Sequence, residues 1–179
     1  MLKQSTSRQD GFTVLEIVVV ATIVLVLVGV SIPAFEKWQE KAKKVTCISK
    51  MKAIHGAFAA AITDQGEWPQ IPTNEEGELP DWDQKDYFQF WIQEMEKYGL
   101  SHNSWVCPSD EDAIRQMRTE GTENFVGSYI PSWFSGGSNT PFKWNQPWVV
   151  ERAGFHGGGH HVVMPDGSVT ESTNPFSGR

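Results

Sequence analysis

The stretch that decides the architecture of this chain spans residues 11–35 and reads GFTVLEIVVVATIVLVLVGVSIPAF. From Phe12 to Phe35 it carries one charged residue, Glu16, close to its start. A bilayer core about 30 Å thick needs about 20 apolar residues in a helix that rises about 1.5 Å per residue. The stretch meets that length, and it predicts a transmembrane helix over residues 12–35.

Glu16 is the feature that an ordinary membrane anchor leaves unexplained. A bare acidic side chain in hydrocarbon costs at least about 2.5–3.5 kcal/mol, so an acid within a membrane span indicates a function. The layout also differs from that of a secretory signal peptide, whose small-residue cleavage site follows the apolar core. Here the small-residue junction, Gly11–Phe12, precedes the apolar run. Cleavage there would remove the polar leader, residues 1–11, and leave the apolar helix on the mature chain.

Four residues of this stretch stand in the register of a prepilin: Gly11, Phe12, Glu16 and Pro33. The chain therefore resembles type IV pilins and type II secretion pseudopilins over roughly residues 8–45. The resemblance implies that a prepilin peptidase cuts between Gly11 and Phe12 and that Phe12 is then N-methylated. It also implies that Glu16, the fifth mature residue, meets the N-terminal amine of a neighbouring subunit, and that Pro33 kinks the helix.

The electrostatics of that pairing favour assembly over simple anchoring. An α-amino group has a pKa of about 7.7–8.0, so it is largely cationic at neutral pH. Pairing this amine with Glu16 in a low dielectric offsets two desolvation costs, and removing one partner would cost roughly 3–5 kcal/mol. The contact joins different patches on the two subunits, and such a contact, when repeated, builds an open helical filament.

The helix is expected to continue beyond the membrane as an amphipathic segment over residues 36–65. Apolar side chains recur there at three- and four-residue steps; they are Trp38, Ala42, Val45, Ile48, Met51, Ile54, Phe58 and Ile62. Gly66 and then Trp68-Pro69 predict its end, because proline lacks a donor and restricts the residue before it. The remaining residues, 66–179, form a globular head. The predicted fold class is α+β and pilin-like, with a long kinked N-terminal helix packed on a small, mostly antiparallel sheet.

Within the head, the sequence predicts one helix and several short strands. Residues 66–86 are rich in Pro, Gly and acidic residues and predict an irregular connection, and residues 87–98 have helical spacing with a stop at Gly99. The strand candidates, separated by turn-forming residues, are 104–108, 125–134, 147–150 and 160–171. The last contains Asp166-Gly167 between two alternating runs, and this dipeptide is the strongest short signal for a β-hairpin.

A second resemblance lies at the C-terminus. His156 is followed by nine residues and then by Asp166-Gly167, the H-X9-DG pattern of a large group of prepilin-type proteins. Residues 107–110 (Cys-Pro-Ser-Asp) and Ser128-Tyr129 are similar to that group as well. The resemblance supplies no chemistry for the motif. We favour a structural role, in which Asp166-Gly167 forms the turn and the histidine hydrogen-bonds the aspartate or a backbone carbonyl across the hairpin.

Metal binding is the alternative interpretation of this region. His156, His160, His161 and Asp166 offer enough ligands for zinc. Residues 160 and 161 are adjacent, however, so on a strand they face opposite ways and do not both ligate easily. Calcium is a possibility in the acidic loops, at residues 81, 83 and 86 or 110–112, although neither cluster has the layout of an EF-hand loop. The sequence predicts no metal site, no cofactor and solvated acidic loops.

The charge is distributed unevenly along the chain. Residues 36–52 hold six lysines against two glutamates, a net charge of +4. Residues 53–179 hold seven Lys or Arg against 18 Asp or Glu, a net charge of −11. The basic segment suits anionic lipid headgroups or an acidic neighbouring subunit, while a solvated helix face is the alternative. The acidic head argues against nucleic acid as the main partner, because phosphate binding needs a basic surface.

Cys47 and Cys107 are the two cysteines of the chain, and both would lie outside the inner membrane. In an oxidising compartment an even pair predicts a disulfide, here closing a loop of about 60 residues. Two buried free thiols are the alternative. Most tryptophans lie in the head, where they are expected to enlarge a small core; those seven are Trp68, Trp82, Trp91, Trp105, Trp133, Trp144 and Trp148.

Enzymatic function is not expected, because the chain contains no Gly-x-Ser-x-Gly elbow, P-loop or His-Glu-x-x-His motif. We expect a filament subunit of a type II secretion pseudopilus or a type IV pilus-like fibre. Its partners would be a prepilin peptidase, other pilin or pseudopilin subunits, the inner-membrane assembly platform and membrane lipid. It would cross the inner membrane once, with a cytoplasmic N-terminus and a periplasmic head. The alternative is a prepilin-anchored adhesin or carbohydrate-binding module that exposes several tryptophans.

Overall fold

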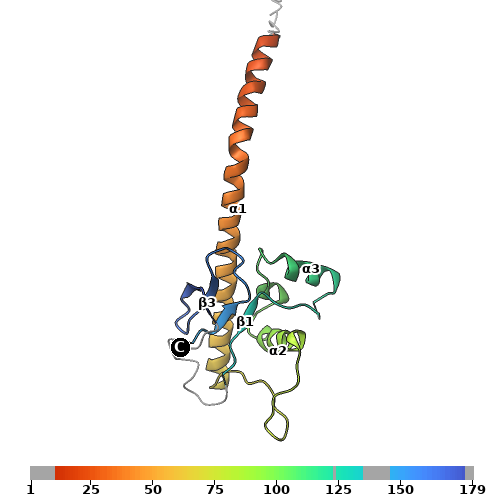
Figure 1. Ribbon diagram of the computed structural model, residues 1–179, viewed down its shortest axis with the longest axis vertical. Coiled ribbons are helices and arrows are strands. Elements are labelled where there is room, and N and C mark those ends of the chain that lie inside the picture. Colours follow the sequence, from red (N-terminus) through yellow and green to blue (C-terminus); the bar gives the residue numbers. More distant parts are fainter. Residues whose placement is uncertain (1–10, 123, 135–145, 176–179) are drawn as a thin grey trace, which may run out of the picture. The chain divides into compact units, whose positions relative to one another are not determined.

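The computed structural model describes residues 11–122, 124–134 and 146–175. Its fold is α+β, with a long N-terminal helix and a four-stranded antiparallel sheet (Figure 1). The chain divides into two compact units, the first ending at Glu40 and the second beginning at Lys41. Helix α1 (Val14–Gln65) runs through both units, and each unit is described by itself.

In the first unit, α1 is apolar as far as Phe35, and its large apolar side chains are exposed. Its large apolar side chains between Phe12 and Phe35 are 50–83% exposed. By length and composition this helix could cross a membrane. The helix begins after Thr13, whose hydroxyl oxygen accepts a hydrogen bond from the backbone N–H of Glu16 at 3.3 Å. The helix assignment continues through residue 33, and the kink expected at Pro33 stays a prediction.

In the second unit, one face of α1 is buried against the head. The buried positions are Cys47, Met51, Ile54, Ala57, Phe58 and Ala61, which lie on one helical face. The predicted apolar stripe is therefore confirmed from this point onward. The side chains of Trp38, Ala42 and Val45, which precede these positions in the stripe, are exposed. Periodicity shows which side chains can share a face, but it does not show where along the helix the packing starts.

Helix α2 (Gln84–Glu96) confirms the predicted head helix, but it begins three residues earlier. Asp83 caps its N-terminus, and Asp83 and Asp86 form a reciprocal capping box. The helix ends before Gly99, which has a φ of 88°, a backbone conformation that favours glycine. The predicted irregular connection is also confirmed, since residues 66–83 contain no helix or strand.

The segment between α2 and the sheet differs from the prediction. Residues 104–108 form no strand; the 3-10 helix η1 (His102–Trp105) occupies its start. Helix α3 (Glu111–Thr119) was not predicted. Its N-cap is Asp110, whose side chain accepts from the backbone N–H of Ala113 at 3.0 Å. Acidic residues in its first turn and Arg118 in its last suit the helix dipole, and these charges stabilise the helix.

The sheet contains β1 (Tyr129–Pro131), β2 (Val149–Glu151), β3 (His160–Val163) and β4 (Val169–Ser172) in the order β1-β2-β3-β4. Each neighbouring pair is antiparallel. The predicted C-terminal hairpin is confirmed. Its turn is closed by hydrogen bonds from Met164 N–H to Ser168 O and from Gly167 N–H to Met164 O, both 2.9 Å long. Gly167 has a φ of 78°, as the turn requires.

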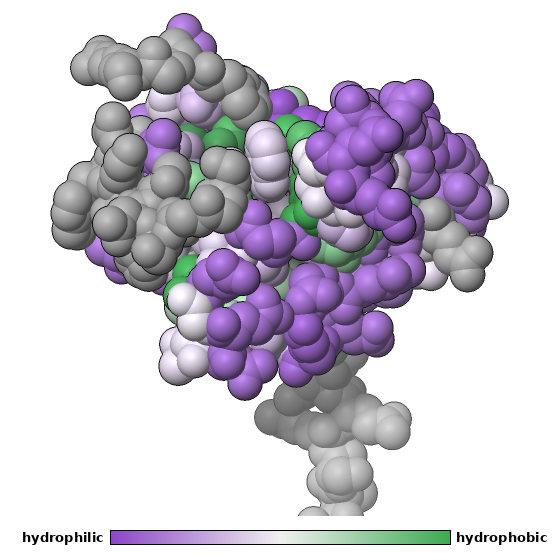
Figure 2. Space-filling model, turned by 90° about the horizontal axis from the view of Figure 1, so that it is seen from below, coloured by the Kyte–Doolittle hydropathy of each residue, from purple (hydrophilic) through white to green (hydrophobic). Residues whose placement is uncertain are grey.

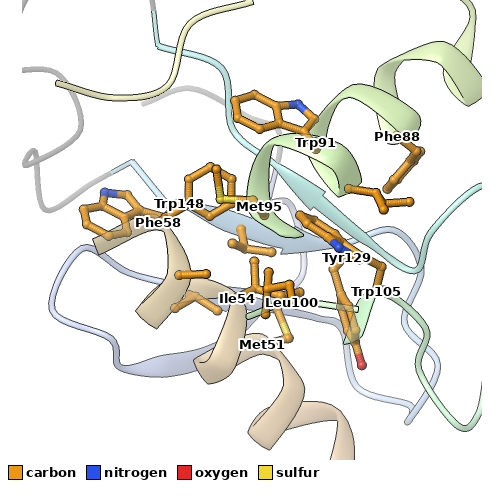
Figure 3. Packing of buried hydrophobic residues seen from close by; sticks show 14 of the residues in the cluster. Met51, Ile54, Phe58, Phe88, Trp91, Met95, Leu100, Trp105, Tyr129 and Trp148 are labelled. Carbon is orange, nitrogen blue, oxygen red and sulfur yellow. The ribbon is translucent and has the colours of Figure 1, made fainter. Parts of the chain in front are cut away.

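Aromatic side chains from α1, α2 and the sheet fill the core (Figure 3). Phe58 stacks on Trp68, with ring centroids 4.6 Å apart, and also packs against Trp91 at 5.2 Å. Trp68 in turn meets Trp148 edge-on at 5.2 Å. Four head tryptophans are buried, namely Trp68, Trp91, Trp105 and Trp148, which confirms the core interpretation for them. On the face of the second unit seen in Figure 2, hydrophilic residues cover most of the described surface.

Tyr87 gives the second unit a predicted response to alkaline pH. Its hydroxyl donates to the Pro131 carbonyl at 2.6 Å, and burial raises its pKa from 10.0 to about 12. The stabilisation is therefore fully present below pH 10 and is lost as the pH rises towards 12. Tyr87→Phe should cost about 1 kcal/mol at neutral pH and remove this alkaline loss. Urea titrations at several pH values measure both effects, and an unchanged alkaline loss in the variant would contradict the assignment.

Candidate functional site

The first candidate site is the start of α1. Gly11, Phe12 and Glu16 are exposed, and Glu16 lies in the first helical turn. The Thr13 cap gives Glu16 a second possible role. Threonine at the N-cap with glutamate three residues later is the pattern of a capping box, in which the acid supports the helix start. One of the two hydrogen bonds of a capping box is present, from the backbone N–H of Glu16 to Thr13 Oγ1.

The second candidate site surrounds a disulfide. Cys47 and Cys107 are bonded to each other, which confirms the predicted bridge, and both residues are fully buried. Cys47 belongs to the buried face of α1, and Cys107 follows η1. The bridge therefore ties α1 covalently to the middle of the head.

Glu151 is the buried acid of this region. It ends strand β2 and is 0% exposed. One of its carboxylate oxygens, Oε2, accepts from the backbone N–H of His161 at 3.0 Å and lies 2.8 Å from Nδ1 of the same histidine. The other oxygen, Oε1, is buried and has no hydrogen-bond partner among the described residues. Nε2 of His156 lies 3.9 Å from this oxygen.

His156, the first residue of the C-terminal motif, lies against the disulfide. Its Nε2 is 3.3 Å from Cys107 Sγ, and its ring centroid is 5.6 Å from that of His161. The two histidines and Glu151 thus form one buried cluster next to the bridge. The hydrogen bond expected from His156 to Asp166 or to a carbonyl stays a prediction. The structure describes a contact of His156 with the sulfur atom of Cys107.

The other end of the motif contacts α1 two helical turns further on. His55 Nε2 lies 3.0 Å from the Pro165 carbonyl, and the His55 ring stacks on Trp148 with centroids 4.5 Å apart. A Cβ on Gly167 would lie 3.2 Å from His55 Cε1, so the turn approaches the helix closely. His156 and Gly167 therefore lie against Cys47 and His55, eight residues apart on α1 and about 12 Å along its axis.

The aspartate of the motif serves the turn itself, as predicted. Asp166 accepts from the backbone N–H of Ser168 at 2.9 Å, and hydrogen bonds from Ser168 lower the pKa of this carboxyl. Beyond the turn, Glu171 of β4 pairs with Lys44 of α1, and this hydrogen bond lowers the pKa of Glu171. The hairpin is thus fastened to α1 at Lys44, next to the disulfide and at His55.

The structure does not assemble the histidine set that the sequence offered for zinc. His160 and His161 contact different atoms of Glu151: His160 Nδ1 lies 2.8 Å from its backbone carbonyl, and His161 Nδ1 lies 2.8 Å from its carboxylate. Asp166 is engaged in the turn. The acidic residues considered for calcium have other roles here, because Asp83 and Asp86 cap α2 and Asp110 caps α3.

Asp110 also joins the two segments that carry the second resemblance. Its Oδ2 accepts from Ser128 Oγ and from Arg152 Nη2, each at 2.8 Å. Ser128 Oγ in turn accepts from the backbone N–H of Cys107 at 2.8 Å. The Cys-Pro-Ser-Asp segment and Ser128-Tyr129 are therefore linked through a buried carboxylate. Burial raises the pKa of Tyr129 well above its ordinary range, and the nearby charges of Glu151 and Asp110 add to that effect.

The tryptophan platform that a carbohydrate-binding head would need is not evident on the described surface. Trp82 is half-buried and Trp133 is 46% exposed, while Trp144 lies outside the described residues. Trp82 lines a cavity of about 310 Å³ together with side chains of α2 and the sheet, among them Tyr87, Phe88, Ile130 and Arg152. This cavity offers aromatic faces and one cation, without the row of exposed rings that a sugar platform requires.

Comparison of the chain with protein-family models, with curated proteins and with solved structures finds no match. The functional argument therefore depends on the chain's own residues.

Sequence reasoning missed Glu151, His55 and Lys44, which together hold the C-terminal motif in place. Glu151 had a detectable signal, because it directly follows Val149-Val150 at the end of the predicted strand 147–150. An acid at such a position needs a buried partner. His55 and Lys44 had no comparable signal, since each looked like an ordinary polar residue of an amphipathic helix.

Removing Glu151 should destabilise the second unit strongly. Glu151→Ala leaves the buried N–H and Nδ1 of His161 without their acceptor and is expected to cost about 3 kcal/mol. Glu151→Gln keeps a carbonyl oxygen in that place and should cost less than half as much. Urea titration of the full chain in mild detergent, followed by tryptophan fluorescence, measures both. Equal losses for the two variants would show that the hydrogen bonds to His161 do not carry the effect.

Proposed function

We propose that this chain is a prepilin-type filament subunit. A prepilin peptidase cuts it between Gly11 and Phe12, and the mature chain assembles into a type II secretion pseudopilus or a type IV pilus-like fibre. The observation that carries the proposal is the first unit of the structure. Between Val14 and Phe35 this unit is an apolar helix whose large side chains are 50–83% exposed, with one acid in its first turn.

Exposed apolar surface of this extent needs a cover, which is either lipid or the helices of other subunits. A filament subunit uses both in succession, first in the membrane and then in the fibre. Glu16 supports the second stage, because an acid at the helix start can pair with the amine that cleavage creates on a neighbouring chain. The net charge of −11 over residues 53–179 agrees with a head that faces water.

The fastening of the head to α1 suits the same role. A subunit that is drawn out of a membrane by its helix must transmit that pull to its head. The disulfide at Cys47, the Lys44–Glu171 ion pair and the contact of His55 with the hairpin turn all join the second half of α1 to the head. These links would keep the second half of α1 attached to the head during assembly.

Processing is the most direct test of this proposal. The full chain is expressed with and without a prepilin peptidase, and the intact mass of the purified protein is measured. We expect loss of residues 1–11 and gain of one methyl group on Phe12, and a Gly11→Val variant should stay uncut. A mature N-terminus at another junction, or an unprocessed chain in the presence of the active peptidase, contradicts the proposal.

A further inference from the structure

We propose that, when its disulfide is reduced, this chain binds a zinc ion through Cys47, Cys107, Glu151 and His156. These four residues offer one ligand atom each, and all four atoms lie within 4.8 Å of one another. The inference goes beyond the filament role and does not depend on it. It also differs from the histidine set considered from the sequence, because it shares only His156 with that set.

The distances suit tetrahedral zinc. Zinc binds thiolate sulfur at about 2.3 Å and imidazole nitrogen or carboxylate oxygen at about 2.0–2.2 Å, so the ligand atoms of a tetrahedral site lie about 3.3–3.8 Å apart. Cys107 Sγ and His156 Nε2 are already 3.3 Å apart, and His156 Nε2 and Glu151 Oε1 are 3.9 Å apart. Once the bridge is reduced, the two sulfur atoms separate to a comparable distance by rotation of their side chains.

The chemistry of the donors also suits zinc. Two thiolates, one imidazole and one carboxylate are ligands of the kinds that structural and catalytic zinc sites use, whereas Ca²⁺ and Mg²⁺ prefer sets made of oxygen atoms. Glu151 Oε1 is the independent observation that points to a cation. It is a buried carboxylate oxygen without a hydrogen-bond partner among the described residues, and it faces His156 beside the bridge. Such an atom is costly to bury unless a positive charge compensates it.

The surroundings of the site hold these donors in place. His161 binds the second oxygen of Glu151 through both its backbone N–H and its Nδ1, which leaves Oε1 pointing to the site. The backbone N–H of Ser109 lies 3.5 Å from Cys107 Sγ and would stabilise a thiolate there. Residues that hydrogen-bond to metal ligands orient those ligands, and removing such a residue typically weakens metal binding by about 10–100-fold.

The two states would preserve the same link between α1 and the head. Under oxidising conditions Cys47 and Cys107 form the disulfide, and under reducing conditions zinc holds both sulfur atoms. With a phosphine as reductant, the phosphine gives two electrons to the disulfide and takes one oxygen atom from water, which yields a phosphine oxide and two thiols. Zinc then displaces the two thiol protons and forms two zinc–sulfur bonds.

Cobalt(II) serves as the spectroscopic probe of this site. The full chain in mild detergent, reduced with a water-soluble phosphine, is titrated with cobalt and then with zinc. We expect equimolar binding, a thiolate-to-cobalt charge-transfer band, the visible bands of tetrahedral cobalt, and loss of all these bands when zinc displaces cobalt. The oxidised chain should show none of them. A reduced chain without the charge-transfer band, or equal binding by the oxidised chain, overturns the proposal.

Variants separate the folded site from two thiols that happen to bind metal. His156→Ala and Glu151→Gln should each weaken cobalt binding by at least about 10-fold, the lower limit expected even for residues that only hydrogen-bond to a ligand. His102→Ala and Glu111→Gln change the same residue types away from the site and should bind as the unchanged chain does. The assignment is overturned if both site variants bind cobalt as tightly as the unchanged chain does. It is also overturned if the reduced chain binds cobalt equally tightly when it is unfolded in urea. If one site variant does not fold, the other variant still tests the site, and so does the comparison of the reduced with the oxidised chain.

Discussion

Glu16→Gln is expected to leave membrane insertion and peptidase processing unchanged but to abolish incorporation into filaments. In the proposed fibre the Glu16 carboxylate meets the N-terminal amine of a neighbour in a low dielectric. Removing one partner of such a pair costs roughly 3–5 kcal/mol, which corresponds to at least about a 100-fold loss of incorporation. The measurement compares the amount of subunit in sheared filaments with the amount in the membrane fraction.

Glutamine is the informative replacement, because Glu16 also stands in the first turn of α1 behind the Thr13 cap. Glutamine can fill the third position of a capping box as glutamate does, so the variant removes the charge and keeps the capping ability. Thr13→Ala is the matched control, since it weakens the cap by about 1 kcal/mol and keeps the acid. If Glu16→Gln assembles normally and Thr13→Ala does not, Glu16 serves the helix start and the assembly role is wrong.

The parts of the fold that sequence predicted correctly depend on local signals. The buried face of α1 from Cys47 to Ala61 follows from helical periodicity, and Asp166-Gly167 predicts its hairpin because the turn geometry requires such residues. Helix α2 lies within a few residues of its predicted range for the same reason. Helix α3 escaped detection because its N-terminal signals, Asp110 and the acids after it, also look like a solvated acidic loop.

The grouping of Glu151 and His156 with the two cysteines could not be predicted, because these four residues come from four separate segments. Cys47 lies on α1, Cys107 follows η1, Glu151 ends β2, and His156 lies in the loop before β3. Sequence spacing says nothing about which of these side chains share a site. The resemblance at the C-terminus drew attention to His156 and Asp166 as a pair, whereas in the structure each has its own partner.

Replacing both Cys47 and Cys107 with alanine should cause the largest loss of stability in the second unit. The bridge closes a sequence separation of 60 residues, and the chain-entropy model gives about 4 kcal/mol for a loop of that length. Both residues are fully buried, so the two alanines also leave unfilled space beside Met51 and His156 and add to the loss. For a domain of this size, the melting temperature should fall by roughly 10–15 °C.

The double variant alone does not separate the bridge from the packing of its sulfur atoms, but the unchanged chain reduced in the presence of a chelator does. Reduction keeps both sulfur atoms in the core and removes only the covalent link, so it should cost about 4 kcal/mol, somewhat less than the double variant does. Addition of zinc to the reduced chain should restore part of this stability, since a ligand that binds only the folded state stabilises it. The double variant lacks both thiols, so zinc should leave its urea midpoint unchanged. A loss below about 1 kcal/mol on reduction would mean that the packing around Cys47, and not the bridge, fastens α1 to the head.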